Sequence, residues 1–380
     1  MSLDGAESGV PFCDLGAAHT ARGEVIEAAL VRVARSGRYV LGPEVEAFES
    51  EWAATCRAAH AVGVGNGTDA LVLILRAAGI GPGDDVVVPA YTAPATWMSV
   101  AWCGGRPVGA DVDPVTGLID PEAAAARCGP RTRAIVGVHL FGRLAPMDAL
   151  RAIADRYDLL LVEDAAQAPG AEEAGRVAGS LGDAAAFSFY PTKPLGALGD
   201  AGAVVTDRPE LADAVRRLRS YGWSSWHGDA PSPGANSRLD ELQAAVLRCQ
   251  LERLAEMRRR LSVLGQRYRE ALGGLGELRL PSRPPGEDRE PAWHQFVVAH
   301  DAREDLRRAL AQRGVGTAVH YDPIPPRLSA FAGAGDFPGA DALSARAVSL
   351  PFDWWLTDAQ VDRVCAAGAE AAAGLGRSET

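Results

Sequence analysis

Short apolar runs alternate with helix-like stretches between residues 61 and 206. The seven runs read AVGVG, DVVVP, RPVGADVD, RAIVGVHL, LLLVEDA, AAAFSFY and GAVVT. Strands that are apolar on both faces and separated by helical segments are typical of a mainly parallel sheet covered by helices. The pattern therefore predicts an α/β fold, in which ligands bind beyond the carboxyl ends of the strands.

After Thr206 the pattern changes, first to a helical stretch and then to a loop rich in Gly, Pro and aromatic residues. Apolar residues at helical spacing predict one long amphipathic helix over 238–272. The Pro-rich segment 281–291 separates it from a last section with fewer strand signals. Since 380 residues exceed one ordinary core, we expect a large domain over 1–250 and a smaller one over 251–380.

Composition and charge exclude several classes of protein. A formal net charge of −11 provides no basic surface for nucleic acid. The sequence has no apolar run long enough to span a membrane, and its polar, acidic start does not resemble a signal peptide, so we expect a cytoplasmic protein. Six scattered cysteines without a C-x-x-C pair indicate reduced thiols and no zinc site.

Lys193 is the only lysine among 38 basic residues. A GC-rich coding sequence accounts for 37 arginines where any positive charge suffices. A lysine amine can lose its proton and attack a carbonyl group, whereas a guanidinium stays protonated. The retained lysine is therefore a candidate for chemistry that arginine cannot perform.

The segment after the first strand reads GNGTDAL, from Gly65 to Leu71. Glycines and a Thr-Asp pair at the start of a helix present free backbone N–H groups and a positive dipole end to an anion. A phosphate site and a turn capped by Thr68 or Asp69 explain this pattern equally well.

Two later strands also end in polar residues. Asp164 and Gln167 follow LLLV, and a carboxylate at the end of a buried strand needs a partner, either a bound group or an internal donor or cation. Ser188 and Lys193 follow AAAF, where a Gly- and Pro-rich loop is expected to desolvate the amine and lower its pKa. An anion site, a carboxylate and a reactive amine at one sheet edge are what pyridoxal 5′-phosphate (PLP) requires.

The sequence resembles the sugar aminotransferases of the DegT/DnrJ/EryC1/StrS family over nearly its whole length. The resemblance rests on co-linear motifs: SGRYVLGPEVEAFESEWA, GNGTDAL, VEDAAQA, GRVAGSLGD, SFYPTK, GANSRLDELQAA and RGVGTAVHY. It implies an α/β fold of the aspartate aminotransferase (type I PLP) class, with a mainly parallel sheet in the large domain and a smaller C-terminal α+β domain.

By this resemblance, Lys193 is the catalytic lysine that binds PLP covalently and moves the proton, and Asp164 pairs with the pyridine nitrogen. Gln167 lies beside the phenolic oxygen of the cofactor. The amino donor implied is L-glutamate. Family members that act as dehydratases have histidine at the lysine position, so Lys193 favours transamination.

The resemblance also implies a phosphate site formed by Gly67, Thr68 and Ser188. Asn236 is similar to the family residue that reaches the phosphate from the neighbouring subunit, which implies a homodimer with shared active sites. The family usually places an aromatic ring over the cofactor where this sequence has Ala93; Tyr91 or another ring is the alternative.

The substrate is less well defined by the sequence. Trp293 and His294, together with NSRLDELQ, resemble the branch of the family that makes 3-amino sugars, so we expect a nucleotide-linked 3-keto-6-deoxyhexose in secondary-metabolite or antibiotic biosynthesis. Trp293 has a core role as an even alternative. His320, Tyr321 and Arg238 are further candidates for the substrate pocket, with packing or an ion pair as their alternatives.

Two more positions depart from the family in the region expected to bind the substrate. Arg327 stands where the family often has histidine, and Asp322 is a local change. Three alternative functions remain: an aminocyclitol or other keto-substrate aminotransferase, a 4-keto sugar aminotransferase, and a non-catalytic regulatory protein that binds PLP.

Overall fold

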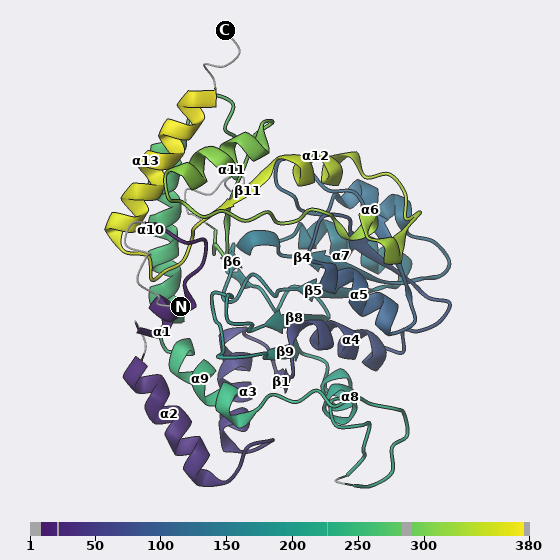
Figure 1. The fold of residues 1–380 in the computed structure, drawn as a ribbon. Helices are drawn as coiled ribbons and strands as arrows, with labels where there is room; N and C mark the ends of the chain where they lie inside the picture. Colours follow the sequence, from purple (N-terminus) through teal and green to yellow (C-terminus); the bar gives the residue numbers. More distant parts are fainter. Residues whose placement is uncertain (1–8, 21–22, 226, 283–290, 376–380) are drawn as a thin grey trace.

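The computed structural model describes residues 9–20, 23–225, 227–282 and 291–375 (Figure 1). Its centre is a seven-stranded sheet in the order β1-β9-β8-β5-β4-β2-β3. Only β9 of this sheet runs antiparallel to its neighbours, so the predicted mainly parallel sheet is confirmed. The strands are β1 (His60–Val64), β2 (Asp85–Pro89), β3 (Arg106–Ala110), β4 (Thr132–Val138), β5 (Leu160–Asp164), β8 (Ala184–Ser188) and β9 (Gly202–Thr206).

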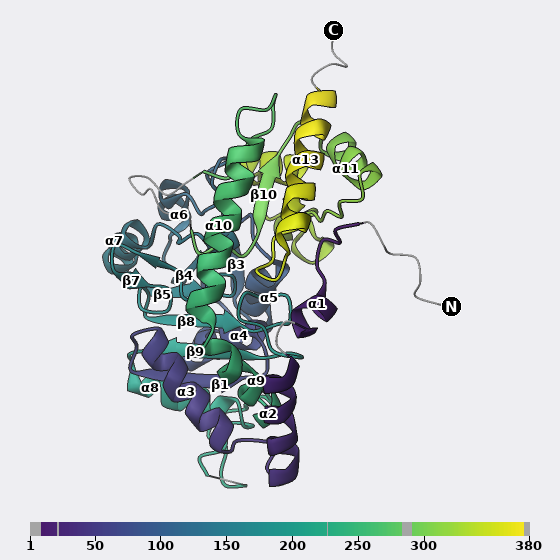
Figure 2. The ribbon, with the colours of Figure 1, turned by 90° about the vertical axis from the view of Figure 1, so that its left-hand side faces the viewer.

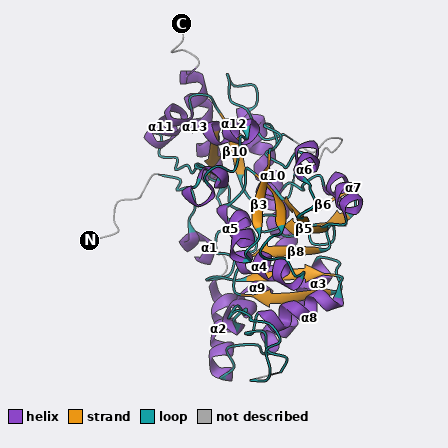
Figure 3. Cartoon of the chain, turned by 90° about the vertical axis from the view of Figure 1, so that its right-hand side faces the viewer, coloured by secondary structure: helices purple, strands orange, loops and turns teal. Residues whose placement is uncertain are grey.

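Helices cover both faces of this sheet (Figure 3). Side chains alternate along each strand: Val86 and Val88 pack with one set of helices, whereas Val87 packs with the other. The first set is α4 (Gly67–Ala77), α5 (Pro94–Trp102) and α8 (Pro209–Leu218); the second is α3 (Pro43–Thr55), α6 (Pro121–Arg127) and α7 (Met147–Tyr157). Because both faces are buried, the strands read as continuous apolar runs.

The C-terminal part has its own two-stranded antiparallel sheet of β10 (Phe296–Ala299) and β11 (Ala347–Leu350). The helices beside it are α10 (Leu254–Leu272), α11 (Arg303–Gln312) and α13 (Asp358–Leu375), and α10 lies alongside α13 in Figure 2. The helix α12 (Pro338–Arg346) returns toward the large sheet, where Asp111 accepts the N–H groups of Gly339 and Ala340. No helix within the described residues is both long and apolar enough to cross a membrane.

The remaining elements are short or lie at the edges of the molecule. They are α1 (Leu15–Thr20), α2 (Gly23–Ser36), β6 (Glu172–Glu173), β7 (Arg176–Val177) and the 3-10 turns η1 (Leu140–Gly142), η2 (Pro325–Arg327) and η3 (Ser329–Phe331).

The prediction of one long helix over 238–272 is wrong. The chain forms α9 (Glu241–Leu251) and then α10, with a break at Glu252 and Arg253. The sequence has no Gly or Pro there, so tertiary contacts decide the break: α9 packs against α2 and α3, whereas α10 packs against α13. The change of partners falls beside the proposed domain boundary at residue 250, which stays a prediction.

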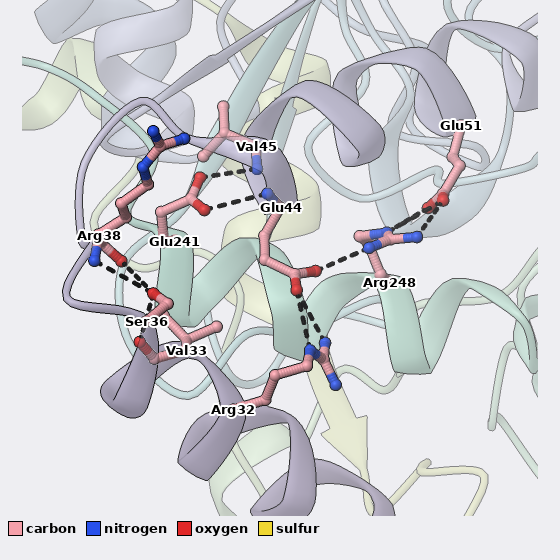
Figure 4. A network of polar contacts seen from close by, with 9 residues as sticks. All are labelled: Arg32, Val33, Ser36, Arg38, Glu44, Val45, Glu51, Glu241 and Arg248. Atoms are coloured by element: carbon pink, nitrogen blue, oxygen red, sulfur yellow. Dashed lines mark hydrogen bonds and ion pairs between the residues drawn. The ribbon is translucent and has the colours of Figure 1, made fainter.

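Glu241 joins α9 to the start of α3 (Figure 4). Its buried carboxylate accepts the N–H groups of Gly42, Glu44 and Val45, all within 3.0 Å. It therefore caps a helix whose own N-cap residue, Gly42, has no side chain to do so. A Cβ atom at Gly42 would lie 2.8 Å from a Glu241 oxygen, so this cap requires glycine.

Candidate active site

A cavity of about 480 Å³ lies at the carboxyl edge of the large sheet. Val138, Asp164 and Ser188, the last residues of three adjacent strands, line it together with the start of α4. The cavity therefore lies beyond the strand ends, where a ligand is expected in a sheet of this kind. The lining residues are Asn66, Gly67, Thr68, Asp69, Leu71, Thr92, Ala93, Ala95, Trp102, Val138, Asp164, Ala166, Gln167, Ser188, Tyr190, Lys193 and Asp200.

The start of α4 forms an anion cradle. Asn66 is the N-cap residue, and its side chain accepts the N–H of Asp69 at 2.8 Å, so the cap is neither Thr68 nor Asp69 as the sequence alternative had it. Gly67 and Thr68 occupy the first turn, where backbone N–H groups have no acceptor within the helix. These groups and the helix dipole face the cavity that Gly67 and Thr68 line, which suits an anion.

Ser188 lies against this cradle. A Cβ atom at Gly67 would approach the Ser188 Cβ to 2.6 Å, so only glycine lets the start of α4 reach the end of β8. Gly202, on β9, has the same role, because its Cβ would lie 2.4 Å from the carbonyl carbon of Asn66. The predicted phosphate residues Gly67, Thr68 and Ser188 therefore come together at one place.

Asp164 is 5% exposed and points into the cavity from the end of β5. The Thr96 hydroxyl donates to its Oδ2 at 2.7 Å, and the Ala166 N–H donates to its Oδ1 at 3.2 Å. Thr92 in turn contacts the Thr96 hydroxyl at 2.9 Å. These donors hold the carboxylate in place. Thr92 and Thr96 could not be found from the sequence, because only the fold brings the start of α5 beside β5.

Gln167 connects this edge to the C-terminal part of the chain. Its Oε1 accepts the Phe141 N–H, so its Nε2 must be the group that donates to the Tyr321 hydroxyl; both distances are 2.7 Å. The Tyr321 ring stacks on the Phe141 ring at 6.5 Å between centroids. The two bonds fix the amide that lines the cavity, and Tyr321 contacts this amide without lining the cavity itself.

Lys193 lies in a tight loop after β8 and is half-buried. Removal of the amine from water lowers the pKa of Lys193 to about 8, although the nearby Asp164 carboxylate opposes the shift. The loop needs Gly196, because a Cβ atom there would lie 2.6 Å from the Pro191 carbonyl oxygen. At neutral pH a larger fraction of this amine is unprotonated than for an exposed lysine, as a nucleophile or general base requires.

His294 and His320 lie beside the lysine loop. The His294 Nε2 contacts the Thr192 carbonyl oxygen at 3.3 Å, and the His320 Nδ1 contacts the Ser349 hydroxyl at 2.9 Å. Burial, with the charge of Lys193, lowers the pKa of His320 to about 4 and holds the pKa of His294 well below its usual range. Both imidazoles are therefore neutral at pH 7, and they add no positive charge near the amine.

Trp293 does not line the cavity. It is 1% exposed and packs on Phe296 and Phe352 in the core, so its proposed place as a substrate contact is corrected to packing. Asn236 is exposed, and Arg238 lies over the Tyr221 ring at 5.6 Å; neither lines the cavity.

The loop over 223–236, which is rich in Gly, Pro and aromatic residues, does not line the cavity where it is described. The rings of Trp223 and His227 contact each other there in a tilted arrangement, with 4.8 Å between centroids and 43° between the planes. Trp226 lies outside the described residues.

Ala93 lines the cavity at the start of α5, where the family usually has a ring. Tyr91 does not replace that ring, since it is 1% exposed and its hydroxyl donates to the His320 carbonyl oxygen. The rings that line the cavity are those of Tyr190 and Trp102.

The other two departures from the family pattern lie outside the cavity. Arg327 pairs with Asp341, and Asp322 pairs with Arg303 at 2.8 Å.

Comparisons with known proteins agree with this geometry. The model of the DegT/DnrJ/EryC1/StrS aminotransferase family matches residues 21–368. The chain is 48% identical over 360 residues to dTDP-3-amino-3,4,6-trideoxy-alpha-D-glucose transaminase from Streptomyces venezuelae, covering 93% of this chain and 94% of that protein. It is 47% identical to the erythromycin biosynthesis sensory transduction protein EryC1 from Saccharopolyspora erythraea, covering 94% and 98% of the two chains.

The structure is also similar to a solved one, the crystal structure of S. venezuelae DesV in complex with a ketimine intermediate. The TM-score is 0.92 at 46% sequence identity, and the match covers 96% of this chain and 99% of that one. The aspartate aminotransferase-like α/β fold implied by the resemblance is thereby confirmed.

The cavity fits the PLP cofactor on which this family depends. Because Gly67 has no side chain, the start of α4 has room for a phosphate. Asp164 offers a buried carboxylate, and Lys193 offers an amine of lowered pKa. The chain is a PLP-dependent aminotransferase that belongs to the DegT/DnrJ/EryC1/StrS aminotransferase family.

Proposed function

We propose that the protein transfers the amino group of L-glutamate to a nucleotide-linked 3-keto-6-deoxyhexose and so forms the 3-amino sugar. The observation that carries the proposal is the convergence of the Lys193 amine, the Asp164 carboxylate and the α4 anion cradle on one cavity. The choice of sugar is supported by the relatives, two of which are transaminases of dTDP-3-amino-3,4,6-trideoxy-alpha-D-glucose. The name of another relative, the erythromycin biosynthesis sensory transduction protein EryC1, supports a place in antibiotic biosynthesis. A cytoplasmic location stays a prediction from the sequence.

When bound, PLP supplies an electron-accepting ring that weakens the C–H bond next to the amino nitrogen of the donor. Asp164 would hold a proton on the ring nitrogen, and its Thr96 and Ala166 donors fix the carboxylate in place. The N–H groups of Gly67 and Thr68, with the Ser188 hydroxyl, bind the phosphate.

Lys193 moves the proton of the reaction. We place its amine as the base that would take the proton from the donor's α-carbon and as the acid that would then give it up. Its pKa of about 8 suits both steps near neutral pH, since an efficient acid-base group has a pKa close to the working pH. The same steps in reverse deliver the amino group to the keto sugar, which predicts ping-pong kinetics.

We further propose a homodimer in which Asn236 of each subunit completes the phosphate site of the other. The proposal is supported by the exposed position of Asn236 outside its own cavity and by the family resemblance. It is tested by mixing two inactive variants, Lys193→Arg and Asn236→Asp, under conditions that exchange subunits. A shared site restores up to about a quarter of the wild-type activity, because half of the dimers are mixed and hold one intact site. No restoration in dimers that are shown to have exchanged subunits would contradict the shared site.

The substrate is tested in a single half-reaction. The enzyme in its pyridoxamine phosphate form is mixed with nucleotide-linked 3-keto and 4-keto sugars, keto sugars without a nucleotide, and keto cyclitols. We expect the absorbance of the PLP form to return with the nucleotide-linked 3-keto sugar at a rate at least tenfold above the 4-keto isomer. Reaction with cyclitols alone, or faster reaction with the 4-keto sugar, would replace the proposed substrate.

A further inference from the structure

A second cavity, of about 90 Å³, lies between the large sheet and the C-terminal part of the chain. It shares no lining residue with the active-site cavity. Residues 114–117, Phe141 and Arg143 approach it from the loops after β3 and β4, and β10 and α12 form the opposite wall. Its size admits a small ion or molecule of a few non-hydrogen atoms.

Arg143 is the notable residue of this cavity, because it is buried without a counterion. Arg143 is only 6% exposed. Its one hydrogen bond among the described residues runs from Nη1 to the Ser282 hydroxyl, at 2.9 Å. Among the described residues, its Nε has no acceptor and no carboxylate forms an ion pair with it. Asp113 is the nearest acidic influence, and its Oδ1 already accepts the N–H groups of Val115 and Thr116.

The surroundings of Arg143 do not neutralise it. Burial, together with the charge of Arg269, lowers the pKa of Arg143 to about 10. The guanidinium therefore remains charged at neutral pH, and a buried charge without a partner destabilises a folded protein.

The remaining charged groups of the cavity are also mainly basic. Arg279 and Arg346 line it and share one carboxylate, that of Asp301, which is half-exposed. Among the residues that the structure describes, the lining contains no Asp or Glu. Within the described part of the chain, the three guanidinium groups of this lining have one paired carboxylate between them, so these side chains carry excess positive charge.

We propose that this cavity is a second binding site, which takes a small oxyanion of the carboxylate or phosphate class and holds it on the guanidinium of Arg143. A guanidinium presents parallel N–H donors that match the two oxygens of such a group, and the buried Nε lacks the acceptor that the anion supplies. The apolar wall of Val297 and Leu343 limits the size of the rest of the ligand.

An anion in this cavity also touches residues that hold the active site. Tyr91 and Phe141 line the cavity. The Tyr91 hydroxyl donates to the His320 carbonyl oxygen, and the Phe141 N–H donates to Gln167. Binding therefore joins the loops after β3 and β4 to the C-terminal part of the chain beside the catalytic cavity. The proposal does not depend on the identity of the sugar substrate.

The test measures thermal unfolding of the PLP-loaded enzyme in low-salt buffer with added phosphate, acetate or chloride. The bound cofactor keeps the α4 phosphate site filled during the titration. At an anion concentration tenfold above its Kd, we expect the Tm of the wild type to rise by roughly 2 °C. A response to phosphate alone assigns the phosphate class, and a response to acetate assigns the carboxylate class. No response to either oxyanion would overturn the proposal.

Arg143→Met separates this site from other anion sites. Without added anion the variant should unfold at a Tm equal to or above that of the wild type, since a charge without a counterion has been removed. With phosphate or acetate its Tm should not change. A response equal to that of the wild type would place the anion elsewhere and overturn the proposal.

Two further variants keep the test decisive. Ala342→Leu fills part of the cavity and leaves the guanidinium in place, so it should lose at least tenfold in anion affinity by calorimetry. It carries the test if Arg143→Met does not fold, and unchanged affinity in Ala342→Leu would contradict the site.

Arg216→Met, which removes a guanidinium from the exposed face of α8, is the matched control and should respond as the wild type does.

Discussion

Glu163 and Asp164 are adjacent on β5, and both are buried, but they point to opposite faces of the sheet and have different surroundings. The two oxygens of Glu163 accept four hydrogen bonds, from the His139 ring and from the N–H groups of Gly179, Leu181 and Gly182. Asp164 accepts only two, from Thr96 and Ala166, and the rest of its carboxylate faces the cavity.

The difference separates a structural carboxylate from a functional one. Backbone N–H groups cannot reverse, so Glu163 must remain an acceptor at both oxygens, and it ties the 179–182 segment to the sheet. The Thr96 hydroxyl can donate or accept a hydrogen bond, so it can also pair with an amide that replaces the Asp164 carboxylate. The same chemical change, from an acid to its amide, should therefore remove activity at one residue and stability at its neighbour.

The largest effect is expected for Asp164→Asn. The Thr96 hydroxyl can accept from the new amide while the Ala166 N–H still donates, so the Tm should change by less than about 2 °C. Because an amide cannot hold the proton on the cofactor ring nitrogen, kcat should fall by roughly 10²–10³-fold, the loss typical for a removed electrostatic partner. Steady-state kinetics and thermal unfolding measure the two effects, and a loss of stability without a loss of kcat would reverse the assignment.

Glu163→Gln should give the opposite result. The new NH₂ group must face at least one N–H donor, which leaves buried polar groups unpaired and lowers the free energy of unfolding by about 3 kcal/mol. The kcat of the folded fraction should stay within a factor of two. Denaturant unfolding measures the loss, and Glu210→Gln on the exposed start of α8 is a control that should change it by less than about 0.5 kcal/mol.

Thr96→Val should have a smaller effect on activity. It removes one hydrogen bond to Asp164, worth about 1 kcal/mol, and so should lower kcat or cofactor affinity by roughly fivefold. Thr206→Val is the matched control, since that buried hydroxyl donates to the Asp183 carbonyl oxygen outside the active site. Equal kinetic effects of the two variants would show that Thr96 acts on stability alone.

The smallest effect concerns pH. Burial raises the pKa of Glu163, but the His139 ring and the N–H groups of Gly179 and Gly182 outweigh it and hold the pKa below its usual value of 4.5. The stabilising contribution of Glu163 is therefore fully present above pH 4.5 and is lost as the pH falls through the lowered pKa. The difference in unfolding free energy between the wild type and Glu163→Gln should therefore be constant above about pH 5 and shrink below 4.5. A difference that grows on acidification would contradict this assignment.

Much of the fold could be predicted from the pattern of apolar runs. All seven runs form strands of one sheet, because strands buried on both faces need continuous apolar sequence. The break between α9 and α10 could not be predicted, since CQLERLAEM has no helix breaker and the partners of each helix decide where the chain bends.

The candidate site divides in the same way. Gly67, Thr68, Asp164, Gln167, Ser188 and Lys193 all line one cavity, as expected from their places at strand and helix ends. Thr96 and Tyr321 act through partners 68 and 154 residues away in sequence, and no local signal gives such pairings. The sequence could not place Trp293 either, because a buried ring has the same sequence signal in a core as in a pocket.

The most direct test of the central claim uses the single lysine of the chain. The PLP-loaded enzyme is treated with borohydride, which makes the link to the cofactor permanent, and its peptides are mapped by mass spectrometry. One cofactor per chain should be found, on the peptide that contains Lys193, and Lys193→Arg should carry none. Cofactor on another residue, or activity without any link to Lys193, would contradict the account.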